Sequence, residues 1–202
     1  MSDQQTIDVY NDQVETYTRM VDSEKPGTAL IKFTEAIPVG GKVLDLGCGP
    51  GNSAAYFSKN GLDVDAVDAS PEMVRKANET YKIAARVAVF DDLQAKAEYD
   101  GIWANFSLLH APKADFPRHL KQIGAALKPH GYFHIGMKLG SGELRDRIGR
   151  LYTYYTEEEL QKHLENAGFH TVWKKAGEEA GLSGEISPFA VILTQKQVRI
   201  SS

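Results

Sequence analysis

The chain of 202 residues has little of what marks several classes of protein. It contains one cysteine, so it cannot form an internal disulfide. Its formal net charge is −4, which leaves no excess of lysine and arginine for the basic surface that nucleic-acid-binding proteins usually need. No apolar run approaches the length of a membrane-spanning helix, and residues 1–12 are polar, unlike a signal peptide. We therefore expect a cytoplasmic protein without nucleic-acid or membrane partners.

What is present is the composition of one globular domain. Hydrophobic residues make up 42% of the chain and charged residues 25%, which is ordinary usage for a folded protein of this size. Strand-like and helix-like segments alternate along the sequence without repeats. This alternation predicts an α/β fold, a Rossmann-like doubly wound sheet of seven mostly parallel strands with helices on both faces.

A glycine-rich stretch, residues 43–51, is the most informative part of the sequence. An apolar run at its start has the length of a buried parallel strand, and three glycines follow at alternate positions: Gly47, Gly49 and Gly51. Glycine allows the backbone to turn tightly and a ligand to lie against main-chain N–H groups. Residues 52–57 then have helix-compatible spacing. The stretch therefore predicts a strand, a loop and a helix whose N-terminus lies near a bound nucleotide.

The loop departs from two common nucleotide-binding patterns. A dinucleotide-binding loop has glycine at its sixth place, where this chain has Asn52, and a P-loop ends in a lysine that this loop lacks. Asp45, just before the loop, would also repel a diphosphate. A carboxylate at that place instead suits a ligand with cationic groups. S-adenosylmethionine fits, because it carries a sulfonium and an ammonium and has no phosphate.

The stretch Leu44–Gly51 resembles the first motif of the class I S-adenosylmethionine-dependent methyltransferases, and the resemblance covers roughly residues 40–195. The organisation is similar to the small-molecule branch of these enzymes, which includes tellurite-resistance-type and quinone-biosynthesis-type members. The resemblance implies that the last strand of the sheet runs antiparallel. It also implies that the loop contacts the cofactor through Asp45, Gly47, Cys48, Gly49 and Gly51.

A second acidic position strengthens this interpretation. Residues 62–68 alternate apolar and acidic side chains, as a strand would, and end at Asp68. Asp68 follows Gly47 by about 20 residues, the separation expected for a carboxylate that binds the ribose hydroxyls. The resemblance adds Ala69 to the cofactor contacts and places Met73 against the adenine. Ordinary core packing would explain Met73 equally well.

Two further segments resemble cofactor-binding parts of the family. A short apolar strand ends in two carboxylates, of which Asp91 matches the adenine-binding position, while Asp92 could be only a solvated turn residue. Residues 99–110 resemble the fourth strand, whose end lies next to the transferable methyl group. Tyr17, on an N-terminal helix, would cover the cofactor or pack in the core. The implied contacts in these segments are Asp91, Asp92, Leu93, Ala104, Asn105, Phe106 and Tyr17.

The sequence says less about the methyl acceptor. His110, just past the fourth strand, is our candidate for a base or substrate contact; the alternative is that it caps a helix or bonds a backbone carbonyl. The segment after the fifth strand is basic, aromatic and rich in glycine. It predicts a lid that closes over a small acidic or aromatic acceptor and holds a carboxylate with a guanidinium, or else a solvated loop. The candidate substrate residues are Lys138, Arg150, Tyr152 and Tyr154.

Missing motifs favour a small-molecule acceptor. The end of the fourth strand lacks the Pro-Pro-aromatic string with which amino-methylating DNA enzymes hold a flipped base. The only cysteine, Cys48, lies in the glycine loop, which argues against a cytosine-C5 thiol nucleophile and against arsenic methylation. No metal is expected.

Hydrophobic spacing predicts several further elements. Ile7, Tyr10 and Tyr17 fall on one face of an N-terminal helix, and residues 114–127 form an amphipathic helix. A capping box opens another helix after Thr156. Residues 132–137, 169–174 and 188–194 supply the last three strands.

We expect a single methyltransferase domain over residues 1–202. A helical cap (1–36) precedes the cofactor-binding core (40–137), the substrate lid (138–156) and the C-terminal part of the sheet (157–195). The predicted function is transfer of a methyl group to a small molecule by in-line displacement, carried out by a monomer or homodimer. Two alternatives remain: a non-catalytic regulator that binds S-adenosylmethionine or S-adenosylhomocysteine, and an NAD(P)-dependent oxidoreductase.

Overall fold

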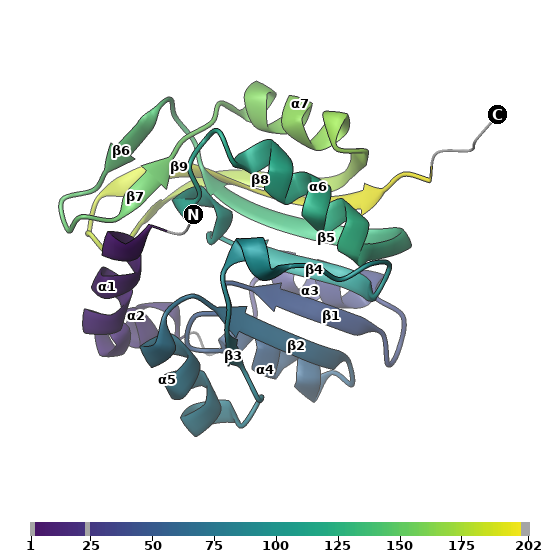
Figure 1. The fold of residues 1–202 in the computed structure, drawn as a ribbon, viewed down its shortest axis with the longest axis horizontal. Coiled ribbons are helices and arrows are strands. Elements are labelled where there is room, and N and C mark those ends of the chain that lie inside the picture. The colour runs from purple at the N-terminus through teal and green to yellow at the C-terminus, as the bar shows by residue number, and fades with distance from the viewer. Residues whose placement is uncertain (1–2, 23–24, 199–202) are drawn as a thin grey trace.

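The computed structural model describes residues 3–22 and 25–198, and a seven-stranded sheet forms its centre (Figure 1). The strands are β1 (Lys42–Leu46), β2 (Asp63–Asp68), β3 (Arg86–Val87), β4 (Tyr99–Asn105), β5 (Leu127–Lys138), β8 (Phe169–Ala180) and β9 (Ile186–Lys196). Their order across the sheet is β3-β2-β1-β4-β5-β9-β8. β9 runs antiparallel to both of its neighbours, β5 and β8, and the remaining pairs of the sheet are parallel. The expected Rossmann-like sheet with an antiparallel last strand is confirmed.

Helices cover both faces of the sheet. In Figure 1, α6 (Phe116–Ala126) and α7 (Glu157–Asn166) lie in front of it, and α3 (Thr28–Ala36) and α4 (Asn52–Lys59) lie behind it. Alternate residues of β1 serve the two faces, because Val43 packs in a cluster with Phe33 and Phe57, whereas Leu44 packs in a cluster with Leu120. This alternation is what a strand buried on both faces requires. The remaining elements are α1 (Gln4–Asp12), α2 (Val14–Val21), α5 (Pro71–Tyr81), η1 (Phe90–Asp92), η2 (Leu108–His110), and a hairpin of β6 (Glu143–Arg145) and β7 (Leu151–Thr153).

The N-terminal segment forms two helices where one was expected. The break is at Gln13, whose φ of −103° and ψ of 14° leave the helical region. The shared face nevertheless persists, since the rings of Tyr10 in α1 and Tyr17 in α2 meet edge to face with centroids 5.3 Å apart. Tyr10 and Tyr17 therefore lie together on one face as predicted, although the helix is interrupted at Gln13.

The third strand is shorter than the apolar run suggested. β3 ends at Val87, which is 56% exposed at the edge of the sheet. The carboxylate of Asp92 accepts a hydrogen bond from the N–H of Val89 at 2.9 Å, and this turns the chain into η1 instead of extending the strand. No α-helix lies between β3 and β4.

Other boundaries also differ from the expected ones. The capping box at Thr156 is confirmed, because its Oγ1 accepts from the N–H of Glu159 while Glu159 Oε2 accepts from the N–H of Thr156. The helix expected over 114–127 begins at Phe116 and ends at Ala126. β5, β8 and β9 are each longer than expected, since strand pairing continues well beyond the apolar residues that marked them.

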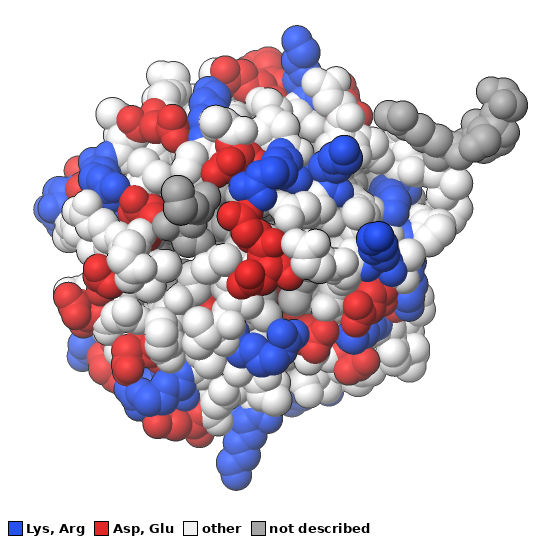
Figure 2. All heavy atoms as spheres, viewed as in Figure 1, with Lys and Arg blue, Asp and Glu red and all other residues white. Residues whose placement is uncertain are grey.

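Charge on the molecule is mixed. On the face drawn in Figure 2, lysine and arginine are interspersed with aspartate and glutamate, with no broad field of positive charge. Across residues 3–22 and 25–198, none of the helices has the length and apolar character needed to span a membrane.

A buried histidine in β5 ties stability to pH. His134 in β5 is fully buried, its ring stacks on Trp103 with centroids 3.6 Å apart, and its Nε2 lies 3.0 Å from Asn105 Oδ1. Its Nδ1 has no hydrogen-bond partner among the described residues. Burial lowers the pKa of His134 to about 3, so the ring is neutral in the folded protein.

We predict that this histidine makes the protein less stable in mild acid. The unfolded chain takes up the proton below a pKa of about 6.5 and the folded chain only near 3, so the free energy of unfolding falls as pH drops between these values. His134→Phe keeps an aromatic ring against Trp103 and should remove about 2 kcal/mol of the loss between pH 7 and pH 5. Urea unfolding at several pH values measures this difference. His170→Phe, at an exposed position, is the control for the loss of one histidine, and equal slopes for wild type and His134→Phe would contradict the assignment.

Candidate functional site

The loop between β1 and α4 turns through glycines with positive φ: Gly47 (+84°), Gly49 (+52°) and Gly51 (+90°). The carbonyl of Val67 at the end of β2 holds its first turn, accepting from the N–H groups of Gly47 at 2.8 Å and Cys48 at 2.9 Å. A Cβ atom on Gly47 would lie 2.3 Å from the Cβ of Ser107. Glycine is therefore what lets this loop pass so close to the chain that follows β4.

Asp68 ends β2 directly beside the loop. Its Oδ2 accepts a hydrogen bond from the N–H of Gly49 at 2.8 Å, and its Oδ1 accepts from the N–H of Ser70 at 2.8 Å. Ser70 in turn caps α5 through Met73 N and donates to Asn11 Oδ1. Burial raises the pKa of the Asp68 carboxyl. The carboxylate is thus fixed in orientation, and each oxygen still has a lone pair for the hydroxyl groups of a ligand.

Asp45 lies below the loop and is only 2% exposed. Its Oδ2 has no hydrogen-bond partner among the described residues. Burial, followed by the neighbouring charge of Asp68, raises the pKa of Asp45 to about 8. The N–H of Ala54 hydrogen-bonds to the Asp45 carboxyl, which partly opposes this rise, and positive charge nearby would favour the ionised form further. Asp68 therefore suits the hydroxyl groups of a ligand, and the buried Asp45 behind the loop suits a ligand that also carries a cation, as S-adenosylmethionine does.

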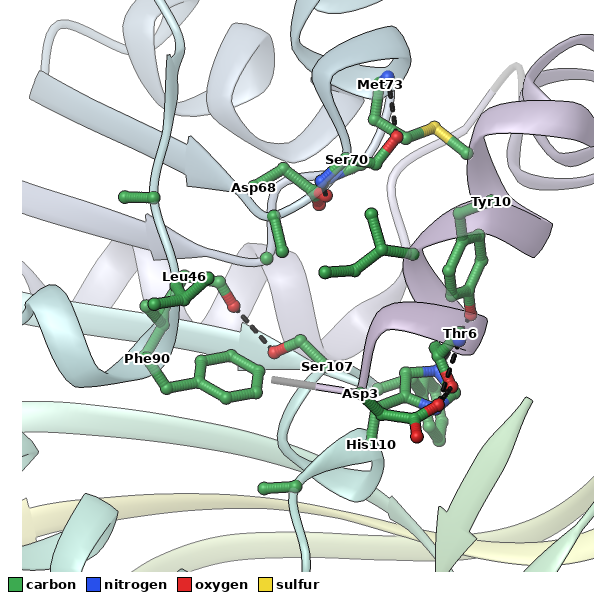
Figure 3. Close-up of a pocket in the computed structure, with 18 of the residues that line it drawn as sticks. Asp3, Thr6, Tyr10, Leu46, Asp68, Ser70, Met73, Phe90, Ser107 and His110 are labelled. Carbon is green, nitrogen blue, oxygen red and sulfur yellow. Dashed lines mark hydrogen bonds between the residues drawn. The ribbon is translucent and has the colours of Figure 1, made fainter. Parts of the chain in front are cut away.

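A cavity opens at the carboxyl ends of β1, β2 and β4 (Figure 3). It encloses about 870 Å³ of atom-free space, part of it open to solvent. The far side is closed by the N-terminal helices, which contribute Thr6, Ile7, Tyr10 and Tyr17. This is where open α/β sheets bind their ligands.

The structure brings most of the expected cofactor residues to this cavity. Those that line it are Gly47, Gly49, Asp68, Ala69, Met73, Asp91, Asn105, Phe106 and Tyr17, together with His110. Others are buried beside the cavity without lining it: Asp45, Cys48, Gly51 and Ala104. Asp92 and Leu93 instead line a neighbouring groove on the sheet.

Phe106 has the most strained backbone of the lining residues. Its φ is +55°, rare for a residue with a side chain, and its N–H donates to the carbonyl of Gly136 at 3.0 Å. Lys138, expected to contact substrate, lies behind this ring with Nζ 5.5 Å from the ring centroid and 3.5 Å from Glu179 Oε1. Lys138 is 5% exposed and does not line the cavity.

Several lining residues were not expected from the sequence: Asp3, Thr6, Ile7, Phe90, Ser107 and His119. Ser107 donates from Oγ to the carbonyl of Leu46 at 2.6 Å and so ties the chain after β4 to β1. Asp3 is the N-cap of α1, since its carboxylate accepts from the N–H of Thr6 at 2.9 Å. An Asp three residues before a Thr at the start of a helix is a local capping signal, and it could have located Asp3.

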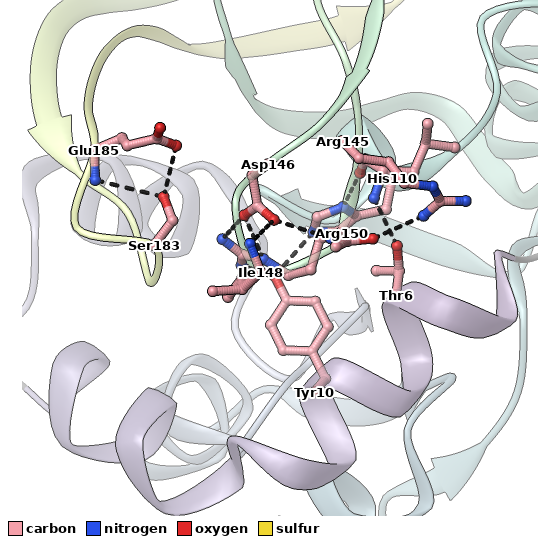
Figure 4. Close-up of polar contacts among 11 residues, drawn as sticks. Thr6, Tyr10, His110, Arg145, Asp146, Ile148, Arg150, Ser183 and Glu185 are labelled. Carbon is pink, nitrogen blue, oxygen red and sulfur yellow. Dashed lines mark hydrogen bonds and ion pairs between the residues drawn. The ribbon is translucent and has the colours of Figure 1, made fainter.

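His110 is held in a chain of hydrogen bonds (Figure 4). Its Nδ1 lies 2.6 Å from the carbonyl of Leu151, which can only accept, so Nδ1 carries the proton. Its Nε2 therefore accepts, and the hydroxyl of Tyr10 donates to it at 2.9 Å. Arg150 Nη1 donates to that hydroxyl at 2.8 Å. Burial lowers the pKa of His110 to about 4. The ring is thus neutral with both nitrogens engaged, which matches the carbonyl-bonding alternative better than the role of a base.

Arg150 does not extend toward an acceptor as the lid hypothesis required. It is 2% exposed, and its Nε and Nη2 donate to Asp146 Oδ2 at 3.0 and 2.8 Å. Its guanidinium lies between the rings of Tyr10 and Tyr152, about 5 Å from each centroid. Neither Arg150, Tyr152 nor Tyr154 lines the cavity. The guanidinium that was expected to hold the carboxylate of an acceptor therefore forms an internal ion pair with Asp146 instead.

The segment expected as a lid, residues 138–156, forms the β6–β7 hairpin that anchors α1. Arg145 donates to both carboxylate oxygens of Asp3, at 2.7 and 3.0 Å, and this holds the pKa of Asp3 well below its usual range. Thr6 Oγ1 accepts from the N–H of Leu151 at 2.9 Å. The hairpin therefore positions the helix that closes the cavity.

The fold and the cavity define a Rossmann-like domain with an adenosine-type ligand site at the ends of β1 and β2. A model of the methyltransferase domain matches residues 22–174. The chain belongs to this family of methyltransferase domains. Among curated proteins, the sarcosine/dimethylglycine N-methyltransferase of Aphanothece halophytica is 34% identical over 112 residues, which are 51% of this chain and 37% of that protein. The chain spans about half, or less, of the length of the curated relatives it matches.

Solved structures share the fold over nearly the whole chain. The 1,6-didemethyltoxoflavin-N1-methyltransferase of Burkholderia thailandensis, solved with bound 1,6-didemethyltoxoflavin and S-adenosylhomocysteine, is 25% identical with a TM-score of 0.71. The match covers 98% of this chain and 92% of that one. A SAM-dependent methyltransferase from Methanosarcina mazei has a TM-score of 0.71 at 18% identity, over 82% of this chain and 96% of its own. The second likeness shows the fold alone.

Substitution of the first loop glycine should separate steric clash from backbone strain. In Gly47→Ala the new Cβ meets Ser107 and the backbone keeps a positive φ, so we expect a loss of roughly 2–4 kcal/mol in the free energy of unfolding. Gly61→Ala is the matched control, because φ is +80° there and nothing lies within 4 Å. It should lose only about 1 kcal/mol. Equal losses in urea unfolding would show that the contact with Ser107 is unimportant.

Removal of the Tyr10 hydroxyl should disrupt the His110 chain. Tyr10→Phe leaves His110 Nε2 and Arg150 Nη1 without this partner, so we expect a loss of about 1–3 kcal/mol in the free energy of unfolding. Tyr17→Phe is the matched control, since no described residue hydrogen-bonds its hydroxyl while its ring contacts Tyr10. Thermal unfolding compares the two, and a Tyr10→Phe protein as stable as Tyr17→Phe would exclude the proposed chain.

Proposed function

We propose that this chain is a class I S-adenosylmethionine-dependent methyltransferase that methylates a small molecule. Family membership supports methyl transfer, and the bound S-adenosylhomocysteine of the Burkholderia neighbour supports the cofactor. The observation that carries the proposal is the Asp68 carboxylate, held by two backbone N–H groups at the rim of the glycine-loop cavity. When bound, S-adenosylmethionine supplies an already activated methyl group, so the contribution of the protein is position.

Each side of the cavity has a role in this proposal. Asp68 accepts from the ribose hydroxyls, and the main chain at Gly47 and Gly49 borders the cofactor. Met73 and Asp91 bind the adenine end. Asn105 and Phe106, at the end of β4, border the methionine portion near the transferable methyl group.

The acceptor space in this proposal lies between α1 and the end of β4. Thr6 and Ile7 line it from one side and Phe106 from the other. Because α1 spans the cavity, it would also exclude water from the reacting atoms. The hairpin of residues 138–156 would hold α1 in place, and α1 would cover the acceptor. Lys138, Tyr152 and Arg150 would then position neighbouring residues and would not contact the acceptor themselves.

A cytoplasmic location and a monomeric or homodimeric state belong to the same proposal. The only cysteine of the chain is a buried free thiol in the glycine loop, so nothing in the sequence calls for an oxidising compartment.

The proposal is tested first by cofactor binding. Isothermal titration calorimetry should detect S-adenosylmethionine and S-adenosylhomocysteine but not NADH. Transfer of a labelled methyl group to members of a metabolite panel then separates an enzyme from a regulator that only binds the cofactor. Tight NADH binding without binding of either adenosyl compound would contradict the proposal.

Asp68 should be essential for that binding. In Asp68→Asn the amide donates where the ribose hydroxyls and backbone N–H groups need acceptors, so we expect the Kd for S-adenosylhomocysteine to rise about 10- to 100-fold. Asp63→Asn, an exposed position on the same strand, is the matched control and should bind normally. If both variants bound like wild type, Asp68 would not be the ribose ligand.

A further inference from the structure

Positive side chains are absent from the cavity wall. Among the described residues, no lysine or arginine lines the cavity, whereas three aspartates line it: Asp3, Asp68 and Asp91. Asp3 and Asp91 are paired with Arg145 and Arg118, whereas Asp68 is held only by backbone N–H groups. A bound carboxylate, phosphate or phenolate would therefore be desolvated near Asp68 without a lining cation to bind it.

The nearest cations are engaged elsewhere. Four cations contact residues at or next to the cavity wall, and each has an acidic partner: Arg118 with the lining Asp91, Arg145 with the lining Asp3, Arg150 with Asp146, and Lys138 with Glu179. Arg150 is also screened from the cavity by the ring of Tyr10. Recruiting any of these for an anionic acceptor would break an ion pair and leave a carboxylate without its partner.

The described residues on the acceptor side of the cavity also include no free base. A general base needs an available lone pair within reach of the acceptor's proton. The Nε2 lone pair of His110 already accepts from Tyr10, and the Asp3 carboxylate accepts from Arg145 and Thr6. The other lining histidine, His119, packs against Phe90 beside Asp91, at the adenine end. An oxygen or sulfur acceptor, which must lose its proton to become a strong nucleophile, finds neither base nor cation.

Aromatic faces and carboxylates suit positive charge instead. Tyr10 and Tyr17 meet edge to face, and Phe106 lines the cavity at the end of β4. Aromatic faces stabilise cations by roughly 0.5–2 kcal/mol each in such settings. The cavity wall therefore favours a reaction in which the cofactor and the acceptor together carry a positive charge before, during and after methyl transfer.

We propose that the acceptor atom is an uncharged nitrogen of a small amine or nitrogen heterocycle; this rests on the proposed methyltransferase function. The nitrogen lone pair forms the new N–CH3 bond while the S–CH3 bond breaks and its electron pair stays on sulfur. The positive charge passes from sulfur to nitrogen, and S-adenosylhomocysteine is the second product. Any proton on the methylated nitrogen leaves afterwards to water. No base is needed before the attack, and the wall faces a cation throughout.

Matched acceptors test this directly. Benzimidazole and N-methylaniline offer uncharged nitrogens on a small ring system, and benzoate, phenol and thiophenol offer oxygen or sulfur on one of similar size. With labelled S-adenosylmethionine, we expect kcat/KM for the nitrogen acceptors to exceed that for the others by at least about tenfold.

A charge-altering variant sharpens the test. Ile7→Lys would add a cation to the cavity from α1, and Ile7→Met is the uncharged control of similar length. We compare kcat/KM for the nitrogen acceptors with kcat/KM for the acidic acceptors, which are benzoate, phenol and thiophenol. The ratio of the first to the second should fall at least about tenfold in Ile7→Lys relative to Ile7→Met. Thermal unfolding and S-adenosylhomocysteine binding establish that both variants are folded.

The outcomes separate this inference from the proposed function. If the acidic acceptors were methylated preferentially, or if the nitrogen acceptors did not react although the cofactor bound, the inference would be overturned and the cofactor assignment would stand. If calorimetry showed no binding of S-adenosylmethionine, the proposed function and the inference would both fall. An unchanged acceptor ratio in Ile7→Lys would also overturn the inference.

Discussion

Two neighbouring groups at the end of β2 hold the glycine loop in place: the carbonyl of Val67 and the carboxylate of Asp68. Val67 accepts from Gly47 and Cys48, and Asp68 accepts from Gly49. Both depend on the register that pairs Val67 with Leu46 in β1. A slip of one residue would point the Asp68 side chain to the opposite face of the sheet, and the loop would lose its acceptors. The apolar residues of β1 and β2 thus determine where a ligand can bind, because their burial fixes that register.

The other wall of the cavity depends on polar contacts. α1 buries only Thr6 and is fastened at its start to the hairpin through Arg145 and Leu151, and near its end to Ser70 through Asn11. Such contacts exchange with water more readily than core packing, so α1 can open locally at a fraction of the global free energy of unfolding. The sheet side of the cavity is rigid, whereas the helix side is suited to admitting and releasing ligands.

The parts that could be predicted from the sequence are those with local signals. Asp68 follows from a strand pattern and a spacing, and the start of α7 follows from the capping box at Thr156. Arg150 could not be placed in this way, because its partner Tyr10 lies 140 residues away. Its charge and its glycine-rich surroundings suggested an exposed lid, yet long-range contacts bury it. The strand expected before Asp91 exists as β3, but its length could not be predicted, since a single hydrogen bond from the N–H of Val89 to the Asp92 carboxylate turns the chain away from the sheet.

A turn outside the cavity determines the charge next to the proposed acceptor space. Between β6 and β7, Asp146 accepts from the N–H groups of Ile148 at 3.1 Å and Arg150 at 2.9 Å, and the same carboxylate binds the Arg150 guanidinium. The turn therefore bends the chain and directs the arginine back onto its own element. Tyr10 then covers the guanidinium and presents a ring, not a cation, to the N-terminal side of the site. Because one aspartate both shapes the turn and neutralises the arginine, hairpin geometry and acceptor charge are coupled. A relative with a different residue at position 146 would have an unpaired cation beside the same cavity, and its acceptor preference would follow that charge.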